Sequence, residues 1–280
     1  MKKKGFTLVE LLAVLIILVA LLLIIIPVVA NSIKEGKEKI YNSQINNIKL
    51  ALESWMSENQ KPNNGEYIVL SLSQLKEAGE VEVDIKNPNT KELFPNDMIL
   101  KIINNDGIIE YEVNDTGSNK SDYSLIPSMK INGNALTYVE LGSQNYIDLG
   151  VTAKDKNNNS INDIDSITEP TLNLGVKGIY ITKYTASSNG YSNTIYRTII
   201  VRDTKGPEIS FSNDLVLTYE AARNYDFKSD IVVTDNSREA VNVTVESNIS
   251  VIPGNYSIKY IATDQSGNET VKFRKVTIKE

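Results

Sequence analysis

The distribution of apolar residues along the chain predicts a long helix at its amino end. Residues 11–30 carry no charged side chain, residues 2–4 are three lysines, and Glu10 is the one carboxylate among the first 30 residues. As a helix, residues 6–30 would extend roughly 38 Å at about 1.5 Å per residue, which is enough to cross a bilayer. We therefore predict a membrane-spanning helix over 6–30, preceded by a short basic head.

An amphipathic pattern extends this helix to residue 59. Apolar side chains recur every three or four positions, which places them on one face of a helix. They are Tyr41, Ile45, Ile48, Leu52 and Trp55. A stripe of this kind is typical either of a helix that binds a partner or of one that covers a sheet of its own chain. We favour the second interpretation and place Trp55 in the core.

Residues 60–117 predict a small αβ domain. A proline and an Asn-Gly pair end the long helix, since both punctuate turns. A short capped helix is expected over 73–78, with a glycine directly behind it. Residues 98–103 and 108–113 read as two strands around an Asn-Asn-Asp-Gly turn, which is a strong hairpin signal.

The remainder of the chain consists of strand-length segments separated by turn residues. A polar stretch rich in Gly, Ser, Asn and Lys predicts a linker at 118–123. Beyond it, residues 178–186 (GIYITKYTA) align with 254–262 (GNYSIKYIA), an offset of 76 residues. A repeat of this length with several short strands indicates two β-sandwich domains, at 124–203 and 204–280.

The composition excludes several kinds of functional site. The chain has no cysteine and no histidine, which rules out disulfides, thiolate nucleophiles, zinc fingers and Ser-His-Asp triads. The net charge of −6 and the pI near 5.0 argue against a nucleic-acid-binding groove, where clustered Lys and Arg are expected. We therefore expect domains held by their cores alone and no nucleic-acid partner.

No constellation of residues predicts catalysis. Asp155 to Asn159 has the alternating oxygen spacing with which a calcium loop begins, but Ser160 stands where that loop needs glycine. Asp264 and Asn268 read as turn residues that hydrogen-bond to their own backbone. Paired carboxylates decide nothing without geometry, and isopeptide crosslinks between Lys and Asn are not indicated. We predict a protein that is not an enzyme, with no cofactor and no metal site.

The string GFTLVELL at residues 5–12 resembles the processing site of type IV prepilins and pseudopilins. In that family a membrane-embedded peptidase cuts after the glycine and methylates the new terminal amine. The resemblance implies a leader at 1–5, cleavage after Gly5 and an N-methylated Phe6. A secretory signal peptide and a plain membrane anchor are the alternatives. The apolar run is long for a signal peptide, and neither alternative gives a reason for Glu10.

Glu10 and Pro27 are the residues to which the resemblance assigns a role in assembly. A lone carboxylate in hydrocarbon must find a partner or become neutral. The family pairs the amine of Phe6 with this glutamate, largely between neighbouring subunits. A position near the wet headgroups is the alternative before cleavage. Pro27 removes a backbone donor inside the helix and predicts a kink, near the place where a pilin helix loosens during fibre assembly.

The repeated β blocks resemble bacterial immunoglobulin-like modules of surface proteins. The glycine-tyrosine strand of such modules is followed by an Ala-x-Asp-x-x-Gly-Asn turn, which stands here at 262–268. In the first copy the turn begins at Ala186 and lacks the aspartate. The expected fold class is α+β. A long pilin-type helix with a small αβ head, lacking the disulfide loop of many such heads, precedes two all-β immunoglobulin-like sandwich domains.

These resemblances imply a type IV pilin-like structural subunit, and the bulky modules imply a minor one that displays them for adhesion or spacing. The expected partners are other pilin subunits, the prepilin peptidase, the assembly platform, the membrane, and a host-surface or glycan ligand. The chain would cross the cell membrane once with its amino end in the cytoplasm, and would later stand in an extracellular fibre. The alternatives are a pseudopilin of a secretion or DNA-uptake system and a membrane-tethered binding protein that never assembles.

Overall fold

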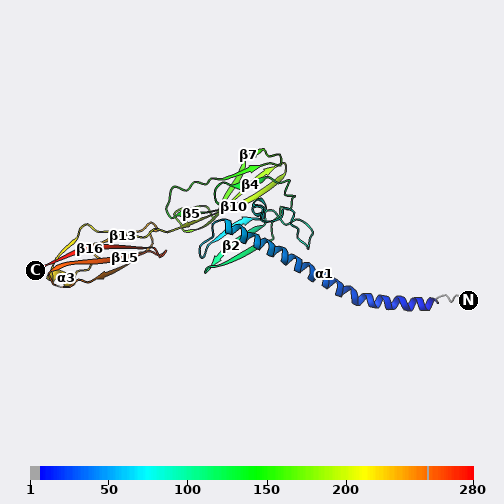
Figure 1. Cartoon of the computed structure of the whole chain (residues 1–280), viewed down its shortest axis with the longest axis horizontal. Coiled ribbons are helices and arrows are strands. Elements are labelled where there is room, and N and C mark those ends of the chain that lie inside the picture. Colours follow the sequence, from blue (N-terminus) through cyan, green and yellow to red (C-terminus); the bar gives the residue numbers. More distant parts are fainter. Residues whose placement is uncertain (1–6, 251) are drawn as a thin grey trace. The chain divides into compact units, whose positions relative to one another are not determined.

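The predicted amino-terminal helix is confirmed in the computed structural model, which describes residues 7–250 and 252–280. Helix α1 (Leu8–Glu58) runs without interruption over 51 residues (Figure 1). Thr7 is its N-cap residue and Asn59 its C-cap residue. The helix is therefore as long as the two successive sequence patterns, apolar and then amphipathic, predict.

The carboxyl-terminal part of α1 covers a sheet of its own chain. Three antiparallel strands form this sheet in the order β1-β2-β3. Their bounds are Tyr67–Ser71 for β1, Ile99–Asn105 for β2 and Ile108–Asn114 for β3. Ile48, Leu52 and Trp55 of α1 are buried, and α1 lies against β3. The interpretation of the apolar stripe as a core face, with Trp55 inside, is confirmed.

The short helix and the hairpin predicted between residues 60 and 117 are both present. Helix α2 spans Leu72–Glu77, and a two-residue turn at Asp106 and Gly107 joins β2 to β3. Both turn residues have positive φ, 51° and 86°, as a type I′ hairpin turn requires. Glycine reaches this conformation without a steric penalty, which explains the strength of the Asp-Gly signal.

The polar segment 118–123 is held against the αβ part of the chain. The backbone N–H of Asn96 donates to the carbonyl of Asn119 at 2.6 Å, and the Asn96 side-chain amide donates to the carbonyl of Ser121 at 2.8 Å. Asn96 is fully buried. The segment thus satisfies polar groups of a buried residue, although its composition is that of a linker.

Helix α2 also contacts the first β module. The Gln74 side chain accepts a hydrogen bond from the Tyr196 backbone N–H at 2.8 Å and donates one to the Tyr196 carbonyl at 3.1 Å. One amide side chain thus pairs with the backbone of Tyr196 as a neighbouring strand would.

By its contacts the chain divides into two compact units, and the division falls within the first β module. The first unit comprises 1–134, 150–166 and 183–197, and the second 135–149, 167–182 and 198–280. The domain boundaries inferred from sequence remain predictions.

The strands after the αβ part belong to two modules. In the first they are β4 (Ser128–Ile131), β5 (Leu136–Glu140), β6 (Val151–Lys154), β7 (Ser160–Ile161), β8 (Ile164–Glu169), β9 (Gly178–Ser188) and β10 (Tyr191–Arg202). In the second they are β11 (Glu208–Ser210), β12 (Leu215–Thr218), β13 (Val232–Thr234), β14 (Asn242–Ser247), β15 (Gly254–Thr263) and β16 (Glu269–Lys279), with helix α3 (Tyr219–Asn224) after β12.

The two modules have the same strand topology, which confirms the repeat seen in the sequence. The four-stranded sheets have the orders β5-β10-β9-β8 and β12-β16-β15-β14. In the first sheet β5 pairs in parallel with β10, and in the second sheet β12 pairs in parallel with β16. The antiparallel pair β4–β6 of the first module corresponds to the antiparallel pair β11–β13 of the second. Ser128 faces Lys154 in the first pair, and Glu208 faces Thr234 in the second. Each residue of the second pair lies 80 positions after its counterpart in the first.

A buried arginine occupies corresponding positions in the two modules. Arg197 and Arg274 are both buried. The Nε of Arg197 donates to the carbonyl of Asn134 at 3.3 Å, and the Nε of Arg274 donates to the carbonyl of Asn213 at 2.7 Å. Each carbonyl lies two residues before the parallel strand, β5 or β12. The arginine therefore fixes the backbone that enters that strand.

Lys76 in α2 is a buried cation of the αβ part. Its residue surface is 4% exposed, and its Nζ donates to Oδ1 of Asn96 at 2.8 Å. The ammonium also lies 5.6 Å from the centroid of the Tyr123 ring. Burial lowers the pKa of Lys76 to about 8, although the charges of Asp84 and Asp122 act in the opposite direction. The folded chain thus releases this proton far more readily than the unfolded chain.

We expect the free energy of unfolding to rise with pH because of Lys76. The unfolded chain keeps this ammonium protonated up to a pH of about 10.4. Above the folded-state pKa of Lys76, the unfolded chain therefore binds more protons than the folded chain. Relative to a Lys76→Met variant, the wild type should gain about 2 kcal/mol between roughly pH 7 and pH 9.5 in urea denaturation. The exposed Lys86→Met is the matched control. A Lys76→Met difference that stays constant with pH would contradict the assignment.

Candidate assembly helix and carboxylate cluster

The amino-terminal part of α1 presents its apolar side chains to the surroundings. Every residue from 7 to 35 is exposed. The most apolar 18-residue window of the helix has a mean hydropathy of 3.6 and no buried residue, so α1 is long and apolar enough to span a membrane. Water is an unfavourable solvent for such a surface. The segment must be covered by lipid or by other chains.

Glu10 lies in the first turn of α1 and caps it. Its Oε2 accepts hydrogen bonds from the backbone N–H and the side-chain Oγ1 of Thr7, both at 2.9 Å. In return, the Glu10 backbone N–H donates to Thr7 Oγ1 at 3.3 Å. This reciprocal arrangement is a capping box, which satisfies donors that the first turn of a helix leaves free. The carboxylate is therefore placed at the amino-terminal start of the helix.

The other residues assigned to assembly are only partly covered by the structure. Gly5 and Phe6, at which cleavage and methylation are expected, lie outside the described residues. Pro27 lies inside α1, and the helix continues on both sides of it. The lost backbone donor does not end the helix. The ribbon of α1 is visibly curved (Figure 1).

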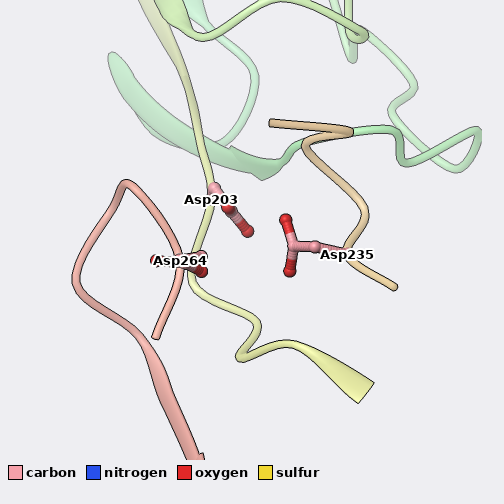
Figure 2. Close-up of side chains that lie close together, drawn as sticks. All are labelled: Asp203, Asp235 and Asp264. Carbon is pink, nitrogen blue, oxygen red and sulfur yellow. The ribbon is translucent and has the colours of Figure 1, made fainter. Parts of the chain in front are cut away.

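Three aspartates of the second compact unit form a cluster that the sequence did not reveal. Asp203, Asp235 and Asp264 each follow directly the last residue of a strand, β10, β13 and β15 respectively. One carboxylate oxygen from each lies within 4.8 Å of the others. Figure 2 shows the three side chains converging from separate segments. We refer to them as the carboxylate cluster.

Asp264 has the turn role that its sequence predicts and also belongs to the cluster. Its Oδ1 accepts the backbone N–H groups of Ser266 and Asn268 at 2.8 Å, and its Oδ2 accepts the Asn268 side-chain amide at 2.8 Å. Burial alone would raise the pKa of Asp264, but the hydrogen bonds from Asn268, Ser266 and Gly267 lower it below its ordinary value. The carboxylate is therefore held in its charged form.

Asp203 and Asp235 are less fully paired. Asp203 is 7% exposed and accepts two long hydrogen bonds of 3.3 Å, from the Lys205 backbone N–H and from Ser266 Oγ. The Oδ1 of Asp235 accepts the backbone N–H and the hydroxyl of Ser237. The Oδ2 of Asp235 is buried, and it has no hydrogen-bond partner among the described residues.

Asp155, in which the sequence showed the beginning of a calcium loop, forms an ordinary turn. Its Oδ1 accepts the backbone N–H groups of Asn157 and Asn159 at 2.9 and 2.8 Å, and its Oδ2 accepts the Asn159 side-chain amide at 3.0 Å. These bonds also lower the pKa of Asp155, with Asn159 the main cause. The prediction of a polar hairpin tip is confirmed.

Two family models match separate parts of the chain. Residues 1–26 match the prokaryotic N-terminal methylation motif. The chain carries the amino-terminal motif of type IV pilins. Residues 129–201 match the Ig-like domain of bacterial surface proteins, and this range covers the first β module from β4 to β10. The pilin motif supports a protein that is anchored in the membrane and then exposed at the surface, and that assembles with other pilin subunits.

Solved structures give only distant similarity. The lipoprotein BT2262 from Bacteroides thetaiotaomicron is 13% identical and has a TM-score of 0.25, with 53% of this chain and 98% of that chain covered. Drosophila N-cadherin EC1-3 is 14% identical at a TM-score of 0.24, with 71% and 80% covered. Human protocadherin-24 EC1-2 is 13% identical at 0.25, with 54% and 99% covered. No curated protein matches the chain.

Proposed function

We propose that this chain is a minor structural subunit of a type IV pilus-like fibre, with a structural and not an enzymatic role. The observation that supports this most directly is the fully exposed apolar segment of α1. The helix begins at Leu8, just after the expected cleavage site at Gly5, and carries Glu10 in its first turn. A passive anchor needs the apolar length but not the carboxylate, whose presence at membrane depth costs a few kcal/mol.

The proposed assembly proceeds in three steps. The chain is inserted with residues 2–4 on the cytoplasmic side, as the positive-inside rule favours. The peptidase then cuts after Gly5 and methylates the amine of Phe6. In the fibre, Glu10 of one subunit pairs with the Phe6 amine of a neighbour, and the apolar faces of residues 11–29 pack together. Pairing with an amine compensates the desolvation of the carboxylate, which the Thr7 hydrogen bonds do only in part.

The two β modules are the basis for the minor role. Residues 124–280 are bulky for a subunit that tiles a whole filament, so a subunit present in few copies, or at the tip, accommodates them better. We propose that they extend the subunit for adhesion or spacing. A pseudopilin, or a tethered binding protein that never assembles, would have the same helix but would be missing from surface fibres.

The mature amino terminus tests the proposal. We expect protein from sheared surface fibres to begin at Phe6 and to carry an N-methyl group, as measured by mass spectrometry of the amino-terminal peptide. Protein from a strain without prepilin peptidase is the control and should begin at Met1. A chain that is cut near Ala30 would indicate a signal peptide. A chain that never occurs in sheared fibres would contradict the role as a fibre subunit.

A further inference from the structure

We propose that Asp203, Asp235 and Asp264 bind one hard divalent cation, with Ca²⁺ preferred over Mg²⁺. This site was not expected from the sequence. The proposal concerns only the carboxylate cluster and is independent of whether the chain assembles into a fibre.

The first argument is the charge that the cluster concentrates. Three carboxylate oxygens lie within 4.8 Å of one another, and Asp203 and Asp264 are each only 7% exposed. Like charges this close and this poorly hydrated repel strongly. Among the described residues no lysine or arginine forms an ion pair with any of the three. Lys177 reaches Ser266 at 3.2 Å, but its ion pair is with Glu239 at 2.7 Å.

The second argument is independent of charge and concerns one atom. Asp235 Oδ2 is buried and lacks a partner among the described residues, while the other oxygen of this carboxylate is hydrogen-bonded to Ser237. An unsatisfied buried acceptor is costly and calls for an explanation, such as a bound ion. Figure 2 shows the Asp235 carboxylate pointing toward Asp203 and Asp264. A cation between the three would satisfy this oxygen.

The geometry suits calcium. Carboxylate oxygens are the ligands of hard cations, and Ca²⁺ binds them at about 2.3–2.6 Å, so two ligands across the ion are separated by up to roughly 5 Å. The 4.8 Å limit of the cluster lies within this span. The ligands come from three irregular segments at strand ends. Ca²⁺ tolerates such irregular geometry, whereas Mg²⁺ demands a near-ideal octahedron at about 2.0–2.1 Å.

The first module supplies an internal control. Asp155 is the counterpart of Asp235 in the repeat, and Ser188 stands where Asp264 stands in the second copy. Asp155 is half-buried, and both of its carboxylate oxygens accept hydrogen bonds within its own turn. We therefore expect one site for each chain, and we expect Asp155→Asn to leave it intact.

Thermal unfolding of the full chain in detergent, after treatment with EDTA, tests the proposal. Extracellular calcium modules bind with Kd values of about 10⁻⁴–10⁻³ M, so about 10 mM CaCl₂ should raise the Tm by about 3–8 °C. The same concentration of MgCl₂ should raise it less. Asp155→Asn should respond as the wild type does. Asp235→Asn keeps the size of the side chain and should lower the calcium affinity at least about tenfold, since one charged ligand is lost.

The Asp235→Asn variant also distinguishes a cation-binding role of Asp235 from a purely hydrogen-bonding role. Without calcium, Asp235→Asn should unfold at a Tm equal to or above that of the wild type, because it relieves repulsion between carboxylates. Asp203→Asn is the second variant if Asp235→Asn does not fold, as judged by circular dichroism. A wild type that does not respond to calcium, or an Asp235→Asn variant with the full calcium response, would overturn the proposal. An equal response to MgCl₂ would overturn the preference for calcium.

Discussion

Replacing Glu10 with glutamine is expected to reduce the amount of this protein in sheared surface fibres at least about tenfold, while its amount in the membrane stays unchanged. The substitution keeps the size of the side chain and removes its charge. An amide cannot form the ion pair with the amine of Phe6 that we propose between subunits. A difference of about 1.4 kcal/mol for each subunit contact already corresponds to a tenfold change.

The capping box provides the control for this experiment. A glutamine at position 10 retains an oxygen that accepts from Thr7, so the capping box with Thr7 remains possible. Thr7→Ala removes the hydroxyl that contacts both Glu10 Oε2 and the Glu10 backbone N–H, but it leaves the negative charge. We expect Thr7→Ala to assemble at close to the wild-type level. The charge-pairing mechanism would be contradicted if both variants lost assembly equally, or if Glu10→Gln assembled normally. Quantitative immunoblots of the sheared and membrane fractions distinguish these results.

Replacing Arg274 with methionine is expected to lower the free energy of unfolding of the second module by about 2 kcal/mol. Arg274 is 3% exposed. Its guanidinium donates to Asp230 at 2.7 and 2.8 Å and to the carbonyl of Asn213 at 2.7 Å. Methionine fills much of the volume but leaves both acceptors without this donor. The loss of a buried donor costs more than the loss of an exposed ion pair.

The same pair makes the stability of this module dependent on pH. The hydrogen bond from Arg274 lowers the pKa of Asp230 below its ordinary value. The contribution of the pair is therefore present at neutral pH and is lost as the pH falls through the folded-state pKa of Asp230. In Arg274→Met this acid-dependent part should be much smaller.

Hydrogen–deuterium exchange followed by mass spectrometry measures the effect within the module. We expect faster exchange in β12, β15 and β16 of Arg274→Met, and unchanged exchange in β1–β3. Lys275→Met is the matched control, because Lys275 is the exposed neighbour of Arg274 on β16. If Arg274→Met and Lys275→Met had equal exchange rates, the buried arginine would have no special role.

Most of the fold could be predicted because its signals are local or periodic. The uncharged run after Glu10 and the stripe that ends at Trp55 predict one long helix, and the structure shows α1 from Leu8 to Glu58. The Asp106-Gly107 pair determines a hairpin turn by its backbone preference alone. The offset of 76 residues between the Gly-Tyr strands indicated two copies of one module, since equal patterns of inward-facing residues need equal partners.

Contacts between distant segments could not be predicted in the same way. Gln74 reads as a residue of a short helix, and nothing near it in the sequence shows that its side chain pairs with the backbone at Tyr196. Such a contact depends on how two elements are brought together after each has formed. The anchoring of 118–123 by Asn96 is of the same kind.

The carboxylate cluster was missed because each member has a sufficient local explanation. Asp264 is a turn residue, Asp235 is the counterpart of Asp155 in the repeat, and Asp203 is the last residue before the second predicted module. A usable signal was nevertheless present. Each of the three aspartates directly follows the last residue of a strand in the second compact unit. Where the ends of several strands meet, the side chains that follow them lie close together. Aspartates that directly follow strands of one module should therefore be considered together as one candidate site.

The connection from β10 to β11 bears on how the molecule would carry tension. The Asp203 carbonyl accepts the Asn268 side-chain amide at 3.2 Å, and its carboxylate accepts Ser266 Oγ. Three residues later, a Cβ on Gly206 would lie 2.6 Å from Thr270 Oγ1, so the backbone approaches β16 closely at this position. A pull along the chain at Asp203 is thus shared with the β15–β16 turn before it reaches β11. For a surface protein in flowing liquid, the drag force at this connection would be borne by several hydrogen bonds acting in parallel. An ion held by Asp203, Asp235 and Asp264 would add the strongest of these interactions.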